Sequence, residues 1–174
     1  IPNLEIRKCF KNDIQKRFSS VFIKHNLHNK LVDALSCGNQ KETYDIFFDM
    51  LQKYVSIRDT ATKAPLENYY HGFLNGIFTS CEKLVSEYHS NYESGNGYPD
   101  ITFKAERNTK AVIIEIKATS NEEDMDELAT KALSQIEEKN YALPFLKQSK
   151  ITDIYAYGLV FCKKDCLVVC KKLK

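Results

Sequence analysis

The chain has 174 residues, of which 43% are hydrophobic and 28% charged, and its net charge is +2. This length and composition are typical of one folded domain and exclude a disordered or collagen-like chain. No apolar stretch approaches the ~20 residues that a membrane helix needs, and no secretory leader is visible, so we expect a cytoplasmic protein without membrane contact. The six cysteines contain no CxxC pair, which argues against zinc and favours free thiols.

The first part of the chain is predicted to be helical. Apolar residues recur at three- and four-residue steps in three stretches, 4–22, 31–35 and 44–54, as one face of a helix requires. The second helix should end at Cys37 and Gly38, since glycine is favoured just after a helix. A loop is predicted over 56–65. Residues 1–65 are therefore expected to form an N-terminal helical segment that packs on a core of residues 66–174.

The core combines helices with two predicted hairpins. A helix is predicted over 66–88, because one apolar stripe runs from Tyr70 through Leu74 to Tyr88. After a turn at 94–97, strands are predicted at 99–105 and 111–118, and again at 154–162 and 166–171. Between the hairpins, Asn121 opens a helix that should end before Pro144. This order predicts an α/β fold with a mixed central sheet flanked by helices.

The first hairpin carries the residues with the clearest chemistry. If it turns about residues 107 and 108, Asp100 lies opposite Glu115, with the side chains about 5 Å apart. Two carboxylates that close repel each other unless a cation lies between them, and Mg²⁺ prefers such oxygen ligands. Strand alternation returns Lys117 to the same face, where its ammonium could stabilise charge on a phosphate or orient a water. The alternative is that Glu115 and Lys117 are a solvent-facing pair on an edge strand.

Further residues are expected to converge on this pair. Glu67 precedes Leu74 by seven positions, so it is predicted on the buried stripe, where a carboxylate is costly unless paired or bound to metal. Gln135 borders the apolar face of the later helix, and Lys139 lies one turn further on. Ile116 should point into the core and leave its carbonyl available to a metal.

These motifs resemble the PD-(D/E)xK nuclease superfamily, and most closely the nuclease-like domains found C-terminal to AAA-ATPase-like modules. The resemblance rests on residues 1–5, 67–73, 90–95, 99–100, 114–117 and 135–141. It implies a restriction-endonuclease-like core, Mg²⁺ or Mn²⁺ as cofactor, and hydrolysis of phosphodiester bonds. We expect the substrate to be nucleic acid, DNA more than RNA. The resemblance also implies an AAA-ATPase-like domain in the same full-length chain as a possible partner.

The resemblance implies a role for each matching residue. Glu67 would be the helix-borne acid, Lys117 the catalytic lysine, and Gln135 the helix residue beside the site. The implied metal ligands are Glu67, Asp100, Glu115 and the carbonyl of Ile116. Relatives often place a tyrosine four residues after the glutamine, whereas that position is Lys139 here and the tyrosine is Tyr141, so a role for Tyr141 is left open.

Candidate nucleic-acid contacts lie around this centre. Lys139, Lys163 and Lys164 could contact phosphates, although a solvated basic edge explains the last two equally well. Tyr98 and Tyr92 could stack on bases, or could pack within the protein. Besides a nuclease, the sequence is compatible with a non-cleaving module that binds nucleic acid or an AAA-ATPase-like domain. A purely structural domain would leave the clustered acids without a reason.

Overall fold

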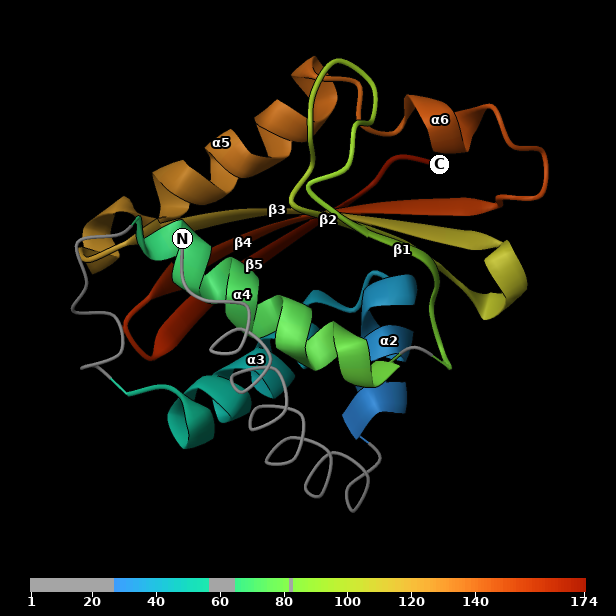
Figure 1. Ribbon diagram of the computed structural model, residues 1–174. Helices are drawn as coiled ribbons and strands as arrows, with labels where there is room; N and C mark the ends of the chain where they lie inside the picture. Colours follow the sequence, from blue (N-terminus) through green and yellow to red (C-terminus); the bar gives the residue numbers. More distant parts are fainter. Residues whose placement is uncertain (1–26, 57–64, 82) are drawn as a thin grey trace, which may run out of the picture.

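The computed structural model describes residues 27–56, 65–81 and 83–174, arranged as one sheet with helices on both faces (Figure 1). The helix predicted at 4–22 and the motif at residues 1–5 lie outside the described residues. The helices are α2 (Leu27–Ser36), α3 (Gln40–Tyr54), α4 (Leu66–Phe78), α5 (Met125–Glu138) and α6 (Leu143–Leu146). The strands are β1 (Ser86–Ser90), β2 (Ile101–Ala105), β3 (Lys110–Thr119), β4 (Asp153–Cys162) and β5 (Asp165–Lys172).

The sheet is mixed, as predicted. Its strand order is β1-β2-β3-β4-β5, with β3 and β4 parallel and every other neighbouring pair antiparallel. Both predicted hairpins are present, as β2–β3 and β4–β5. β3 is the central strand, with two strands on each side of it, and α5 lies in the connection between β3 and β4.

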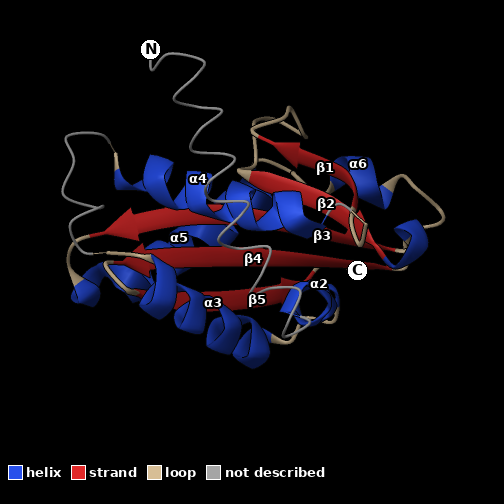
Figure 2. Ribbon diagram, turned by 60° about the horizontal axis from the view of Figure 1, so that its bottom comes forward, coloured by secondary structure: helices blue, strands red, loops and turns tan. Residues whose placement is uncertain are grey.

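Alternation along β3 gives the two faces of the sheet different neighbours. Val112, Ile114 and Ile116 belong to the large core that α2, α3 and α4 cover. Ala111 and Ile113 belong to a second apolar cluster that includes residues of α5. Figure 2 shows α3 and α4 in front of the sheet and α5 behind it. The odd-numbered positions of β3 therefore face α5.

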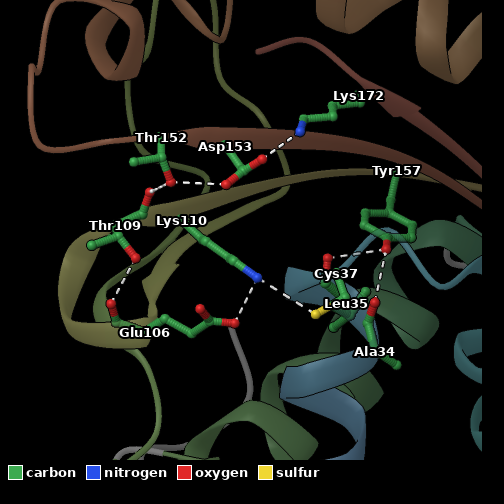
Figure 3. A network of polar contacts seen from close by, with 10 residues as sticks. All are labelled: Ala34, Leu35, Cys37, Glu106, Thr109, Lys110, Thr152, Asp153, Tyr157 and Lys172. Carbon is green, nitrogen blue, oxygen red and sulfur yellow. Dashed lines mark hydrogen bonds and ion pairs between the residues drawn. The ribbon is translucent and has the colours of Figure 1, made fainter.

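The end of α2 is joined to the sheet by polar contacts (Figure 3). The Tyr157 hydroxyl lies 3.3 Å from the carbonyl oxygen of Ala34 and 3.0 Å from that of Leu35, and donates to these oxygens. Lys110 Nζ lies 2.7 Å from Glu106 Oε1 and 3.5 Å from Cys37 Sγ. The predicted helices at 31–35 and 44–54 are thus confirmed and pack into the same core as the sheet. The division of the chain at residue 65 stays a prediction.

One predicted element is wrong at its end. The helix expected over 66–88 stops at Phe78, and Ser86–Ser90 forms the edge strand β1 beside β2. Pairing with β2 outweighs the helical spacing of Tyr88, whose ring instead packs 5.7 Å from that of Phe78. A second unpredicted element is the short helix α6, which holds Pro144 in its first turn.

The composition led to predictions about the cysteines and about membrane-spanning helices. The five cysteines in the described part of the chain are all free: Cys37, Cys81, Cys162, Cys166 and Cys170. Among the described residues, no helix combines the length and apolar character needed to cross a membrane.

Gly158 brings α5 close to the sheet beside the middle of β3. It pairs with Glu115 across the parallel ladder. A Cβ at Gly158 would lie 2.9 Å from Val169 Cγ2, 3.0 Å from the Ala129 carbonyl oxygen and 3.0 Å from Ala132 Cβ. A side chain of any size here would push α5 away from the strand. The close approach of α5 therefore depends on glycine at this position.

We expect Gly158→Ala to lower the free energy of unfolding by about 1–3 kcal/mol, because the added methyl group overfills the contact with α5. Gly72→Ala is the matched control, since nothing lies within 4 Å of its added Cβ in the middle of α4. That control should raise the free energy of unfolding by roughly 0.5–1 kcal/mol. Urea denaturation of both variants measures the difference, and equal stability of the two would contradict this account of α5.

Candidate active site

Asp100 and Glu115 lie next to each other at the end of the first hairpin. The β2–β3 ladder pairs Ile101 with Ile114, so one further step in the same register sets Asp100 opposite Glu115. The main-chain N–H of Ile116 donates to Asp100 Oδ2 over 2.7 Å. Asp100 is therefore fixed by the backbone of the neighbouring strand, while the Ile116 side chain is buried in the core as predicted.

Glu115, Lys117 and Gln135 form a closed set of hydrogen bonds between β3 and α5. Glu115 Oε1 accepts from Lys117 Nζ at 2.9 Å and from Gln135 Nε2 at 2.5 Å. Lys117 Nζ also donates to Gln135 Oε1 over 3.0 Å. Each side chain restrains the other two, so the ammonium and the carboxylate are held in one arrangement. The edge-strand alternative is wrong, because β3 is central and Glu115 is only 3% exposed.

The second carboxylate oxygen of Glu115, Oε2, differs from Oε1 in its contacts. Oε2 is buried and makes no hydrogen bond with any residue that the structure describes. A buried acceptor without a donor costs about 1–3 kcal/mol, more if it is charged. A cation or a proton would remove this cost. Oε2 is therefore the atom around which a bound ion fits best.

The electrostatic environment agrees with this interpretation. Burial, and then the nearby charge of Asp100, raises the pKa of Glu115 to about 7, although Lys117 opposes the shift. Burial also raises the pKa of Asp100, against the opposing hydrogen bond from Ile116. Burial would lower the pKa of Lys117, but the hydrogen bond and charge of Glu115, together with the charges of Glu67 and Asp100, outweigh that effect and raise it. Two crowded carboxylates thus lie beside one protonated lysine.

Glu67 lies near this group without belonging to its buried part. Its predicted burial is wrong: it is exposed, because it occupies the first turn of α4, ahead of Tyr70, the first buried residue of that helix. The Tyr70 hydroxyl donates to the carbonyl of Lys163 over 2.7 Å, which anchors this turn at the end of β4. The charge of Glu67 still raises the pKa of both Glu115 and Lys117.

A polar network that the sequence did not predict supports Asp100 from the other side. His71 Nε2 lies 3.2 Å from the Asp100 carbonyl oxygen and 3.0 Å from Ser90 Oγ. Asn75 donates to Ser90 over 3.2 Å and accepts from the Tyr88 hydroxyl. Ser90 and Tyr88 belong to β1, and these contacts could not be predicted while residues 86–88 were expected to be helical. The four-residue spacing of His71 and Asn75 does place both side chains on one face of α4, which is visible in the sequence.

The carboxylates of the site suit a divalent ion that needs few protein ligands. Within the described ranges, no three His, Cys, Asp or Glu side chains lie close enough together to hold one ion. Mg²⁺ does not need three, because it commonly binds through one or two carboxylates and keeps several waters. Asp100, Glu115 and the unsatisfied Oε2 therefore fit Mg²⁺ or Mn²⁺ better than they fit zinc.

The remaining predicted residues surround the centre at different distances. Lys117 and Gln135 line a hollow along α5, which is also lined by Thr130, Lys131, Ser134, Glu138 and Lys139. Lys163 and Lys164 occupy the β4–β5 turn, beyond the pair Thr119–Cys162 that ends the β3–β4 ladder. Lys164 Nζ donates to the Gln52 carbonyl over 2.7 Å, so this lysine is engaged within the protein.

Tyr141 lies against the site despite its shifted position in the sequence. Gln135 Nε2 donates to the Tyr141 hydroxyl over 3.3 Å, and the ring is buried. The chain turns after α5 at Asn140, which has a positive φ of 55°. The turn brings Tyr141 back to the glutamine from six positions away.

Two comparisons with known proteins bear on this site. The family model of the PD-(D/E)XK nuclease superfamily matches residues 66–171, which include every residue of the candidate site. No curated protein matches the chain. The five-stranded mixed sheet flanked by helices agrees with the restriction-endonuclease-like fold of that family. The chain belongs to the PD-(D/E)XK nuclease superfamily.

Proposed function

We propose that this domain is a metal-dependent nuclease that hydrolyses phosphodiester bonds of DNA in preference to RNA. The observation that carries the proposal is the buried, unpartnered Oε2 of Glu115, held beside Asp100 and Lys117. A structural domain would gain nothing from burying this group, because an unsatisfied acceptor destabilises the fold. Free cysteines in the described residues support a cytoplasmic location.

Each residue has a distinct proposed task. Asp100 and Glu115 would hold Mg²⁺ or Mn²⁺, with the Ile116 carbonyl as a further proposed ligand. Glu67 does not form one ion-sized group with the two carboxylates, so it would reach the ion through a bound water. When bound, the ion would polarise the scissile phosphate and activate a water. The Lys117 ammonium would stabilise the negative charge that develops on the phosphate.

Outside the metal ligands, the proposed tasks are positioning and binding. Gln135 holds Lys117 and Glu115 together through both ends of its amide. Lys139 lines the hollow beside Lys117 and would contact a neighbouring phosphate, and Lys163 would contact one at the sheet end. Lys164 of the same turn would contact a phosphate only after its ammonium leaves the Gln52 carbonyl.

The alternative is a non-cleaving module that binds nucleic acid or an AAA-ATPase-like domain in the same chain. Such a module would have no use for the arrangement of Glu115, Lys117 and Gln135. The two functions are separated by incubating the protein with duplex DNA, single-stranded DNA and RNA in Mg²⁺, Mn²⁺ or EDTA. Binding without cutting under every condition would favour the module.

We expect Mn²⁺ and Mg²⁺ to bind the protein and to raise its melting temperature, because the ion relieves repulsion between Asp100 and Glu115 and satisfies Oε2. Isothermal titration calorimetry measures the binding. Glu115→Gln keeps the side-chain shape but removes its charge, and should abolish binding at millimolar ion. Glu123→Gln, on the exposed turn before α5, is the matched control and should bind like the unchanged protein. Equal binding by both variants would remove Glu115 from the metal site.

We expect Lys117→Ala to lower the rate of DNA cleavage by about 10²–10³-fold, since its charge acts mainly in the transition state. The control is Lys150→Ala, because Lys150 is exposed and lies just before the start of β4. Lys117 pairs with Val160 at the other end of β4, so Lys150 is remote from the site. DNA affinity measured in EDTA should change little in either variant. Cleavage by Lys117→Ala at the rate of the control would show that another group stabilises the phosphate.

The raised pKa of Glu115 predicts how the free energy of unfolding changes with pH. Its pKa is about 7 in the folded protein and 4.5 ordinarily, so the folded state binds this proton more tightly than the unfolded state. Without metal, the free energy of unfolding should fall as the pH rises from about 4.5 to 7, because the stabilising proton is lost. The Glu115→Gln variant should not show the part of this decrease in the free energy of unfolding that comes from Glu115.

Urea denaturation at several pH values measures this profile. Saturating Mg²⁺ should flatten it, because the ion takes the place of the proton. Parallel profiles of the unchanged protein and Glu115→Gln would contradict the assigned pKa.

A further inference from the structure

The segment between β1 and β2 is hydrogen-bonded to residues of the candidate active site at its start and near its middle. At its start, the N–H of Asn91 donates to the carbonyl of Asp100 over 3.0 Å. Near its middle, the N–H of Asn96 donates to the Lys139 carbonyl over 2.7 Å, and Ser94 Oγ donates to the Tyr141 carbonyl over 2.9 Å. This loop, residues 91–98, thus joins Asp100 to the end of α5 (Figure 1).

Two glycines allow the loop to lie directly on the end of α5. Gly95 has a φ of +62°, and a Cβ there would lie 2.3 Å from the Asn140 carbonyl oxygen. A Cβ at Gly97 would lie 3.2 Å from the Tyr141 hydroxyl, the group that contacts Gln135. The loop is therefore in van der Waals contact with residues that border the catalytic group.

This anchored loop exposes two tyrosines. Tyr92 and Tyr98 are each 61% exposed, the largest exposures among the large hydrophobic side chains in the described part of the chain. Tyr98 lies between Gly97, which packs on Tyr141, and the buried Pro99. The Tyr92 ring stacks on His89, with centroids 4.5 Å apart and planes 22° apart. Both rings are thus attached to a fixed backbone and face solvent.

The position of the two tyrosines relates them to the reaction. Tyr98 precedes Asp100 by two residues, so their Cα atoms lie within about 7 Å. Tyr92 follows Asn91, which is bonded to the Asp100 carbonyl. The main chain at both tyrosines therefore lies close to the same candidate metal ligand. A nucleotide next to the scissile phosphate would lie within reach of these rings.

We propose that Tyr92 and Tyr98 stack on unpaired bases, so that the substrate of this site is single-stranded nucleic acid or a single-stranded end. The inference rests on the proposed nuclease function for its substrate. Aromatic side chains on a fixed surface bind single strands through the faces of the bases, whereas bases in a duplex are stacked on each other and not available. Specificity for the strand state would then come from the loop, and catalysis from Asp100, Glu115 and Lys117.

The test measures binding in EDTA, where no metal-dependent cleavage occurs, by fluorescence anisotropy of a labelled oligodeoxynucleotide. Tyr98→Ala should weaken binding of the single strand by roughly 5- to 100-fold, and Tyr92→Ala should do the same. Binding of the blunt duplex should change less than about twofold. Tyr98→Phe keeps the ring and should bind like the unchanged protein. Leu143→Ala, which removes an exposed apolar side chain from α6, is the control for general surface effects.

A strand built from abasic nucleotides separates stacking from phosphate contacts. The unchanged protein and Tyr98→Ala should bind this strand equally, because no base is present to stack. Equal loss of affinity for single strand, duplex and abasic strand would overturn the proposal, as would single-strand binding that neither substitution weakens. Tyrosine-dependent binding without cleavage in any metal would instead refute the nuclease function and leave the base contacts standing.

Discussion

The structure depends on one costly feature, a carboxylate buried on the central strand of the sheet with one oxygen left unsatisfied. Glu115 lies under α5, bonded through Oε1 to Lys117 and Gln135, while Oε2 is buried without a donor among the described residues. Burial and the neighbouring Asp100 raise its pKa to about 7. A fold selected for stability alone would have an apolar residue at this position. The neighbouring buried positions of β3 are apolar, as at Ile113 and Ile114.

The surrounding architecture holds this feature in place. Gly158 faces Glu115 across the ladder and lets α5 approach closely enough for Gln135 to reach the carboxylate. The Tyr141 hydroxyl accepts from the same Gln135 Nε2 that donates to Glu115, and the loop 91–98 packs against Tyr141. Helix, sheet and loop thus meet at one group of side chains, so a change of packing at any of these contacts is transmitted to the site.

The sequence was sufficient for the centre of the site because a hairpin is a local structure. A turn about residues 107 and 108 determines the register, and the register places Asp100 beside Glu115 and returns Lys117 to the same face. The sequence was insufficient where tertiary contacts determine the secondary structure or the burial of a residue. Ser86–Ser90 becomes a strand only because β2 lies next to it, and Glu67 is exposed because it precedes the buried part of α4. The contact of Tyr141 with Gln135 depends on a turn at Asn140 that helical spacing does not encode.

The most direct test of the central claim is to locate a bound ion. A crystal soaked in Mn²⁺ and measured at the manganese absorption edge reveals the ion through its anomalous scattering, independently of any activity. We predict a peak between the carboxylates of Asp100 and Glu115, within bonding distance of Glu115 Oε2. Absence of a peak there at saturating Mn²⁺, with Oε2 of Glu115 still without a ligand, would contradict this prediction.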